Sequence, residues 1–504
     1  MLATVDSCVL AGLEARRVEV QADSANGEAK FALVGLAATS VKEARERVRS
    51  AIKNSNLEFP RRRLTVNLAP AEMRKEGSGL DLPIAVAIAL AESGGRAPTR
   101  SAFLGELALD GAVRHVDGVL VAARCLRKLG VERAFVPSVD ASEAALVAGL
   151  EVMPCRSLAE VVAHLRGLAP ITPQPFTSIA PDDIVGLVVE HDLGDVHGQE
   201  EARRAIEVAA AGGHHVLLSG PPGAGKTMLA RCIPGILPPL ELDEAFEVAQ
   251  VRSLLGDLLP GRPLDWSRPF RAPHHGVSMA GLIGGGSGFA LPGEISRAHH
   301  GVLFLDELAE FQAGVLQALR QPLETGRVTI TRSGGSVTYP ARFTLVAATN
   351  PCPCGWSGDP VRTCRCTPAV IDAYQRRLSG PLLDRIDLQV GVRRVPLAEL
   401  ASEPRGEASA VVKERVLAAR SRQLERQGCL NAQIRPSRLR HLATLEPASR
   451  RTLERWAEQK GLTARGFHRA WRVARTAADL EGAELIGDRH VLEALGYRLH
   501  DVAA

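Results

Sequence analysis

Strand-like and helix-like periods alternate along the chain. In the first third, alternating apolar and polar positions predict strands at 17–21 and 64–68, and wider apolar spacings predict helices at 41–55 and 82–92. From about 182 to 395, short apolar runs separated by helix-like stretches are typical of a parallel α/β core. The pattern therefore predicts an α+β region followed by a parallel α/β region.

After about residue 405 the pattern becomes helical and rich in arginine, and it predicts helices at 411–427, 449–460 and 464–480. Four prolines between 170 and 181 remove backbone donors and favour extended chain, which indicates a linker. The expected parts are a first domain at 1–168, a linker at 169–181, an α/β core at 182–395 and a helical lid at 396–504.

The composition fits a protein of several domains. A chain of 504 residues is expected to form two to four of them, each with its own core. The longest apolar run, Leu82–Ala91, is shorter than the ~20 residues that cross a bilayer, so we interpret it as a buried helix. Nine cysteines, a start without positive charge and Asp6 in the first apolar stretch argue against secretion. We expect a cytoplasmic protein without a membrane partner; the net charge of +4 is too small to indicate any partner.

The clearest chemical pattern follows the apolar strand Val216–Leu218. The pattern G-x-x-x-x-G-K-[ST] is matched by Gly220, Pro221, Pro222, Gly223, Ala224, Gly225, Lys226 and Thr227. Such a loop surrounds phosphate oxygens with backbone N–H groups. Lys226 would reach the β and γ phosphates, and the Thr227 hydroxyl would bind Mg²⁺. ATP and Mg²⁺ are the predicted cofactors.

A second strand completes this site. Val302–Leu305 has the continuous apolar character of a parallel strand buried on both faces, and it delivers Asp306 and Glu307 at its carboxyl end. Asp306 is expected to hold Mg²⁺ and Glu307 to polarise the attacking water. The alternative is a glycine-rich turn beside a surface acidic pair. Two independent motifs in the right order favour the nucleotide site.

Further segments resemble the AAA+ ATPases. Asn350, at the end of an apolar strand that starts at Phe343, resembles the polar sensor that lies between the acidic motif and the γ phosphate. Pro381–Asp387 is similar to the arginine-finger segment of the helicase-like branch, which includes the minichromosome maintenance helicases and magnesium chelatase. The resemblance implies that Arg385 acts on the nucleotide of a neighbouring subunit, which makes an oligomer a catalytic requirement.

Arg465 resembles the second sensor, which the family places on the helical lid. Simpler alternatives exist for both arginines. Arg385 could form a surface salt bridge with Asp384 or Asp387, and Arg465 could be a solvated lid residue. The catalytic residues implied by motif and resemblance together are Lys226, Asp306, Glu307, Asn350, Arg385 and Arg465.

The stretch between the phosphate loop and Val302 is longer than one helix–strand step needs. It contains Arg271–Met279 and the glycine-rich Gly281–Gly288, and the resemblance implies the helix-2 insertion of this branch, a loop that faces a central pore. Beyond the acidic motif, Val328–Thr331 and Val337–Tyr339 flank a turn and predict a hairpin, the family's pre-sensor hairpin.

Arg332, near the tip of this hairpin, would contact a nucleic-acid backbone without sequence preference, although a solvated turn arginine is an equal alternative. A second basic feature lies in the lid. Between 435 and 475 the chain has ten arginines and Lys460, and its acidic residues there are Glu446, Glu454 and Glu458. This excess predicts a basic surface for nucleic acid, or else sensor residues and a subunit interface.

Cys352, Cys354, Cys364 and Cys366 form the clustered thiol set of the sequence. Four thiolates in one short loop suit tetrahedral Zn²⁺, although C-x-C pairs are less usual than C-x-x-C pairs. In a reducing compartment a disulfide is the weaker interpretation. The open alternatives are therefore a zinc site and unliganded loop cysteines.

The first domain extends the resemblance to nearly the whole chain. The segment Arg63–Ala85 resembles the Lon-protease-like domain, of ribosomal protein S5 domain 2 type, found in the ComM and YifB family. At the serine and lysine positions of the Lon dyad this chain has Gly79, beside Ser78, and Leu120. We therefore expect a scaffold or DNA-contacting ring and no peptidase.

The family resemblance implies a homohexameric AAA+ motor that hydrolyses ATP to drive branch migration of recombination intermediates in natural transformation. Its implied partners are single-stranded and branched DNA, bound without sequence preference, and recombination proteins. Two alternatives remain. A magnesium-chelatase-like remodelling ATPase would share the ATP site, and an ATP-dependent protease would require the missing dyad.

Overall fold

The computed structural model describes residues 1–498 apart from 36–38, 73, 74, 76, 178–190, 259–263, 287–289, 333–334, 379 and 397–405. Several predicted features lie partly outside the described residues. They are part of the Arg63–Ala85 segment, the end of the proline-rich linker, the last two glycine-stretch residues and the turn of the predicted hairpin.

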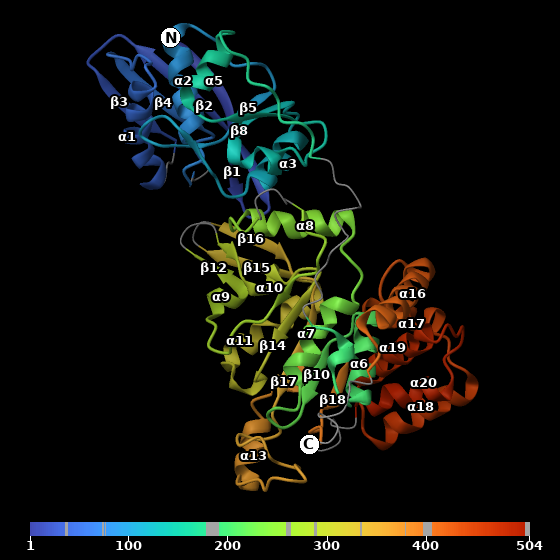
Figure 1. The fold of residues 1–504 in the computed structure, drawn as a ribbon. Coiled ribbons are helices and arrows are strands. Elements are labelled where there is room, and N and C mark those ends of the chain that lie inside the picture. Colours follow the sequence, from blue (N-terminus) through green and yellow to red (C-terminus); the bar gives the residue numbers. More distant parts are fainter. Residues whose placement is uncertain are drawn as a thin grey trace.

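The N-terminal lobe is built on a seven-stranded mixed sheet (Figure 1). In order across the sheet, its strands are β3 (Lys30–Val34), β4 (Arg63–Ala69), β2 (Glu14–Ala25), β1 (Leu2–Ala11), β5 (Ser101–Phe103), β8 (Arg133–Pro137) and β9 (Glu151–Cys155). β2 pairs antiparallel with both β1 and β4, and the other neighbours run parallel. A separate short pair is formed by β6 (Glu106–Leu107) and β7 (Val113–Arg114).

Five helices accompany this sheet, of which α1 and α2 correspond to the two predicted at 41–55 and 82–92. They are α1 (Thr39–Asn54), α2 (Asp81–Ser93), α3 (Val119–Lys128), α4 (Ala141–Ala144) and α5 (Leu158–Leu165). Every residue of α2 from Asp81 to Ala91 is buried, which confirms the predicted buried helix. It packs on β1 and β2 and against α1 and α5, so all of its faces meet protein. Gly94, in the left-handed conformation, ends it.

The first part of the proline-rich segment, residues 170–177, is bound to the N-terminal lobe, and the rest of it lies outside the described residues. Ile171 is buried in the core of the lobe, and the Gln174 N–H donates to the Val152 carbonyl at 2.8 Å. The Thr177 hydroxyl donates to the Ser142 carbonyl at 2.8 Å. Residues 170–177 therefore belong to the packed lobe, because extended chain can hydrogen-bond to strand β9 and to α4.

The second lobe contains a five-stranded parallel sheet. Its order is β11 (Phe270–Arg271), β14 (Val302–Leu305), β17 (Thr344–Thr349), β10 (Val216–Ser219) and β18 (Leu388–Gly391). All four residues of β14 are buried, as its continuous apolar run predicts. Because the strands are parallel, the segments after β10, β14 and β17 all leave the sheet at one edge.

Helices and two hairpins surround this sheet. The helices are α6 (Glu200–Gly212), α7 (Lys226–Ile236), α8 (Leu242–Ser253), α9 (Met279–Ile283), α10 (Glu294–Arg297), α11 (Ala313–Ala318), α12 (Arg320–Thr325), α13 (Pro368–Gln375) and α14 (Gly380–Leu383). The hairpins are β12 (Gly284–Gly285) with β13 (Leu291–Pro292), and β15 (Arg327–Arg332) with β16 (Gly335–Pro340). The second hairpin confirms the one predicted around Arg332.

The C-terminal part is helical and lies beside the sheet (Figure 1). Its helices are α16 (Ser409–Gln427), α17 (Pro436–Leu442), α18 (Pro447–Gln459), α19 (Ala464–Leu480) and α20 (Asp488–Gly496). The three helices predicted from periodicity correspond to α16, α18 and α19. α16 and α19 pack on α6, and α16 also packs on α7, the helix that follows the phosphate loop.

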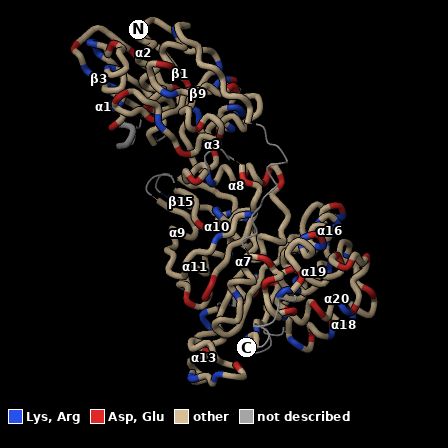
Figure 2. Tube along the Cα trace, in the orientation of Figure 1, with Lys and Arg blue, Asp and Glu red and all other residues tan. Residues whose placement is uncertain are grey.

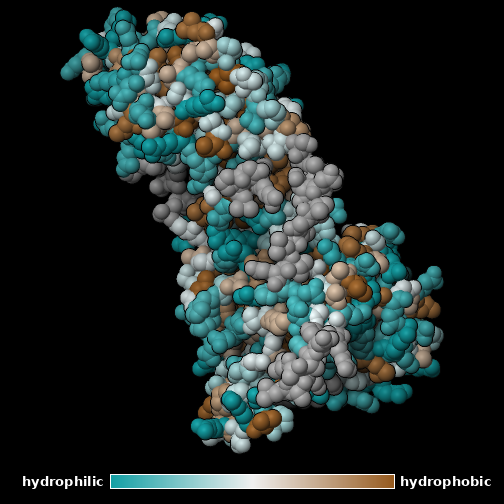
Figure 3. Space-filling model, in the orientation of Figure 1, coloured by the Kyte–Doolittle hydropathy of each residue, from teal (hydrophilic) through white to brown (hydrophobic). Residues whose placement is uncertain are grey.

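Helix α8 joins the two lobes. At its end, the Ser253 hydroxyl donates to Glu143 at 2.6 Å, and the Ser253 carbonyl accepts from the Gly118 N–H at 2.9 Å. One turn earlier, Gln250 accepts from Arg124 at 2.8 Å. Figure 3 shows a mostly hydrophilic surface on the face drawn, with apolar residues scattered singly. None of the described helices is long and apolar enough to cross a membrane.

Candidate nucleotide site and cysteine cluster

The phosphate loop has the predicted strand–loop–helix geometry. β10 ends at Ser219, and α7 begins at Lys226 after Gly225, which adopts φ +93°. At Gly220 a side chain is impossible, because a Cβ there would lie 2.1 Å from the Val392 carbonyl oxygen. The free N–H groups at the start of α7 face the loop, and such a helix start binds anions.

Lys226 is buried and held above the loop. Its Nζ donates to the carbonyls of Gly220 at 2.6 Å and Pro221 at 3.0 Å, and to Asn350 Oδ1 at 3.0 Å. Burial lowers the pKa of Lys226, while Asp306 and Glu307 favour its charged form. These three acceptors are neutral oxygens, so the ammonium group is suited to a phosphate counter-ion.

Thr227 and Asp306 meet across the sheet edge. The Thr227 hydroxyl donates to Asp306 Oδ2 at 2.8 Å, and the backbone N–H of Glu307 donates to Asp306 Oδ1 at 2.9 Å. Hydroxyl and carboxylate oxygens are ligands that Mg²⁺ prefers. The residues present therefore fit the predicted magnesium site.

Glu307 has a partner that sequence analysis did not identify. It adopts a left-handed φ of +52°, and its carboxylate lies 3.2 Å from His275 Nδ1. His275 follows β11 at the same edge of the sheet. Sequence analysis assigned His275 only to the helix-2 insertion, a loop expected to face a pore. In the structure His275 lies beside Glu307 of the acidic motif. The two adjacent histidines, 274 and 275, are the sequence feature that could have indicated this partner.

Arg385 is not among the residues that the structure assembles around the loop. The N–H groups of Asp387 and Leu388 donate to the His215 carbonyl, so this segment lies where β10 and β18 begin. The phosphate loop lies where β10 ends. Arg385 pairs with Glu324. The alternative salt bridge to Asp384 or Asp387 is not the pairing seen.

The finger segment is tied to the lid of its own chain. Asp387 is buried and lies 3.6 Å from Arg469 Nε, on helix α19, and 3.5 Å from His214 Nδ1. His214 Nε2 is 2.8 Å from the Thr476 hydroxyl, also on α19. Arg465, the predicted second sensor, is exposed in the first turn of the same helix.

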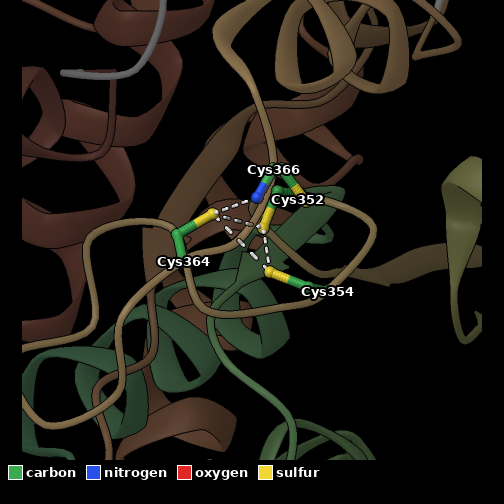
Figure 4. Close-up of side chains that lie close together, drawn as sticks. All are labelled: Cys352, Cys354, Cys364 and Cys366. Carbon is green, nitrogen blue, oxygen red and sulfur yellow. Dashed lines mark hydrogen bonds between the residues drawn. The ribbon is translucent and has the colours of Figure 1, made fainter.

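The four predicted cysteines converge (Figure 4). Cys352 Sγ lies 3.4 Å from Cys354 Sγ and 3.7 Å from Cys364 Sγ, and the latter two are 3.6 Å apart. With Cys366, all four sulfurs lie within 4.8 Å of one another, and all are free thiols. Backbone N–H groups of Arg365 and Trp356 lower the pKa of Cys354 to about 6. The cluster fits a tetrahedral ion, whereas a disulfide requires about 2.05 Å.

A second group of possible ligands, Glu247, His299 and His300, was not predicted. His299 Nδ1 accepts from the Arg342 N–H at 3.0 Å, so its Nε2 carries the proton that it donates to Glu247 at 2.8 Å. A protonated nitrogen has no lone pair for a metal. This group is therefore a hydrogen-bond network that holds α8 to the start of β14.

The glycine-rich stretch of the predicted insertion and the β15–β16 hairpin lie side by side. A Cβ on Gly284 would come within 2.7 Å of Ile330 Cδ1, and one on Gly285 within 3.3 Å of Arg332 Nη2. The Tyr339 hydroxyl of β16 donates to the Ala290 carbonyl at 2.5 Å. The glycine-rich stretch and the Arg332 hairpin thus form one packed unit.

This arrangement of strand order, phosphate loop and acidic pair is that of a P-loop protein of the α/β class. Models of the magnesium chelatase, subunit ChlI and of its C-terminal part match residues 192–400 and 406–498. A third model, described as subunit ChlI of Mg-chelatase, matches residues 18–140. The chain belongs to the magnesium-chelatase-like AAA+ family that includes YifB and ComM.

Relatives match the chain over nearly its whole length. The competence protein ComM of Haemophilus influenzae is 43% identical over 505 residues, which cover 99% of this chain and 97% of ComM. YifB of Salmonella typhimurium is 43% identical over 506 residues, with the same coverage. The magnesium-chelatase 38 kDa subunit of Rhodobacter capsulatus is 29% identical over 176 residues, which are 31% of this chain and 48% of that subunit.

Proposed function

We propose that the chain is an ATP-hydrolysing motor that works on DNA as a homohexamer. The observation that carries the ATP chemistry is the convergence of Lys226, Thr227, Asp306 and Asn350 at one sheet edge. Lys226 would bind the β and γ phosphates, and Asn350 would hold the lysine toward the γ phosphate. Thr227 and Asp306 would hold Mg²⁺, which neutralises phosphate charge when bound.

Glu307 is the proposed group that polarises the attacking water, since it follows Asp306 at the same sheet edge and its carboxylate lies 3.2 Å from His275 Nδ1. Arg385 is proposed to stabilise the transferred phosphate of a neighbouring subunit, and its position away from its own phosphate loop supports this role. Arg465 is proposed as a second contact from the lid, consistent with its exposure at the start of α19.

The DNA substrate is supported by the full-length relative named competence protein ComM. Arg332 is exposed at the end of β15, where six copies would line a basic, sequence-indifferent channel. Branched and single-stranded intermediates of recombination during transformation are the proposed substrates, with recombination proteins as partners and the cytoplasm as the compartment.

The N-terminal lobe is proposed to be a Lon-protease-like, S5 domain 2-type scaffold without peptidase activity. Leu120, at the position of the Lon lysine, is completely buried on the apolar face of the amphipathic helix α3. Lys75, another lysine of the segment that resembles Lon, donates to the carbonyls of Gly35 and Pro70, so its amine is engaged by backbone acceptors. ATP-dependent casein degradation that disappears in Ser78→Ala would contradict this part of the proposal.

Zn²⁺ is the proposed occupant of the four-cysteine cluster. The proximity of the four sulfurs supports it, because four thiolates in one small cluster suit tetrahedral zinc.

The test is an ATPase assay with single-stranded, duplex and four-way-junction DNA, alongside ATP-dependent movement of a labelled mobile junction. We expect stimulation by DNA, strongest with the branched substrate, and none with Lys226→Ala. A wild-type protein that neither moves the junction nor gains ATPase rate from any DNA would contradict the DNA function. It would favour a magnesium-chelatase-like remodelling ATPase, which the ChlI family models support.

A further inference from the structure

The cysteine cluster lies directly against the phosphate loop. A Cβ placed on Gly355 would come within 2.5 Å of Pro222 Cδ and 2.6 Å of Pro222 Cγ, so the two loops are in van der Waals contact. Gly355 follows Cys354, and its N–H donates to the Cys352 carbonyl at 2.9 Å. The turn that presents Gly355 to the phosphate loop is therefore the turn that carries two of the four thiols.

A second connection runs through Asn350. This residue accepts a hydrogen bond from Lys226 Nζ and is separated from Cys352 only by Pro351. The Pro351 carbonyl accepts from Gln375 Nε2, on α13, at 3.3 Å. The segment that carries the cluster thus contacts the phosphate site at two points, Asn350 with Lys226 and Gly355 with Pro222.

The cysteine loop has little other structure to fix it. Between Pro351 and Thr367 the chain forms turns and bends, with no helix or strand. Its local contacts include the stacking of Arg362 over the Trp356 ring at 4.5 Å and the Asp359 carboxylate, which accepts from the N–H groups of Val361 and Arg362. Four thiolates on one ion would cross-link both ends of this loop, and such a link contributes to folding.

A Zn–S distance of about 2.3 Å places the sulfurs of a tetrahedral site about 3.8 Å apart. The separations among the sulfurs of Cys352, Cys354 and Cys364, 3.4, 3.6 and 3.7 Å, are close to that value, so the loop holds these thiols at a spacing that suits the ion.

We infer that metal occupancy of the Cys352–Cys354–Cys364–Cys366 cluster controls the nucleotide affinity of this chain. The bound ion holds Gly355 against Pro222 and Asn350 against Lys226; loss of the ion releases both supports. The inference rests on the proposed ATP site, and it is independent of DNA as the substrate.

The experiment measures zinc content and the equilibrium binding of a fluorescent ATP analogue to the full-length protein. Cys354→Ser and Cys364→Ser are compared with Cys429→Ser, a cysteine in the C-terminal helical part outside the cluster. We expect one Zn²⁺ per chain in the wild type and in Cys429→Ser, and loss of zinc with at least tenfold weaker nucleotide binding in the two cluster variants. Wild-type protein without zinc, or a cluster variant that loses zinc yet binds the nucleotide within twofold of wild type, would overturn the inference.

Two further measurements distinguish an effect of the metal from misfolding, and test the contact of Gly355 with Pro222 by itself. Zinc is removed from the wild type with a chelator and then restored, and we expect nucleotide affinity to fall and recover with it. Gly355→Ala should keep its zinc yet bind nucleotide more weakly, because the added Cβ displaces Pro222. Unchanged affinity in both measurements would contradict the inference. Failure of DNA to stimulate the ATPase would instead count against the proposed function and leave this result standing.

Discussion

The two edges of the five-stranded sheet, where its strands end and where they begin, carry different parts of the proposed ATP site. At the edge where β10, β14 and β17 end, one chain brings together Lys226, Thr227, Asp306 and Asn350 through direct hydrogen bonds. At the edge where β10 and β18 begin, Arg385 is paired with Glu324 and lies apart from that group. On the proposed function, a single chain supplies the groups that bind a nucleoside triphosphate, and the arginine that stabilises phosphate transfer comes from a neighbouring chain.

Removing the arginine should have the largest effect on catalysis. Arg385→Ala is expected to lower the ATPase rate by about 10³–10⁵-fold, because a finger of this kind stabilises charge that develops only during phosphate transfer. Binding of the ATP analogue should stay close to that of the wild type, since Arg385 lies outside the binding edge of its own chain. Arg377→Ala is the control, as this exposed arginine precedes Arg385 in the chain and pairs with a different acidic residue, Glu310, at 3.5 Å. Equal loss in both variants would contradict the specific role.

Changes at the binding edge should separate binding from hydrolysis. Lys226→Ala removes the charged donor and is expected to abolish nucleotide binding. Glu307→Gln keeps the shape of the side chain and should bind ATP normally while hydrolysis falls by about 10²–10⁴-fold. Nucleotide titration and single-turnover hydrolysis measure the two steps. Wild-type hydrolysis in Glu307→Gln would show that another group polarises the water.

His215, at the edge of the sheet where β10 begins, should make the free energy of unfolding depend on pH. His215 Nδ1 accepts from the Leu345 N–H at 3.0 Å, and although part of the residue meets solvent, burial lowers the pKa of His215 to about 4. Below its usual pKa of about 6.5 the unfolded chain takes up a proton that the folded chain does not. The free energy of unfolding should therefore fall as pH drops from about 6.5 towards 4, by up to about 3 kcal/mol.

Denaturant unfolding at pH 7 and pH 5 measures this dependence. His215→Asn keeps an acceptor near the Nδ1 position but does not titrate, so its free energy of unfolding should change less between the two pH values. If both proteins lose the same stability, His215 is not the responsible group.

The smallest expected effect is at the hairpin. Arg332→Ala should reduce DNA stimulation of the ATPase by less than about tenfold and lower the salt dependence of DNA binding by about one phosphate contact, with the basal ATPase rate kept. Arg327→Ala, an exposed arginine at the other end of the same strand, is the matched control. Equal effects of the two substitutions would indicate general surface charge.

The features found from sequence were those encoded in consecutive residues. The loop from Gly220 to Thr227 and the strand before Asp306 could be predicted, because a local pattern fixes both the turn and the chemistry. The pairing of Glu307 with His275 could not, since it depends on the order β11–β14 across the sheet. The contact of Gly355 with Pro222 likewise depends on how two distant loops pack.

The arginine-rich lid shows that the net charge of a segment does not by itself predict the charge of its surface. The arginine-rich segment predicts a basic surface, yet Arg469 and Arg475 are buried, and Arg475 is 2% exposed. Arg475 donates to the carbonyl of Glu484 at 2.7 Å and lies 3.0 Å from Asp479. Figure 2 shows acidic positions interspersed with basic ones on these helices. Part of the positive charge therefore stabilises the interior of the lid, because helix α19 turns these side chains inward.

The most direct test of an ATP site shared between chains is to mix two inactive variants. Lys226→Ala has an intact Arg385, and Arg385→Ala has an intact phosphate loop, so mixed rings contain some interfaces that join both. ATPase activity is measured against the ratio of the two proteins, with exchange of subunits verified by labelled chains. The account predicts that the mixture regains part of the wild-type rate, with a maximum at intermediate ratios. Mixed rings without any recovery would contradict it.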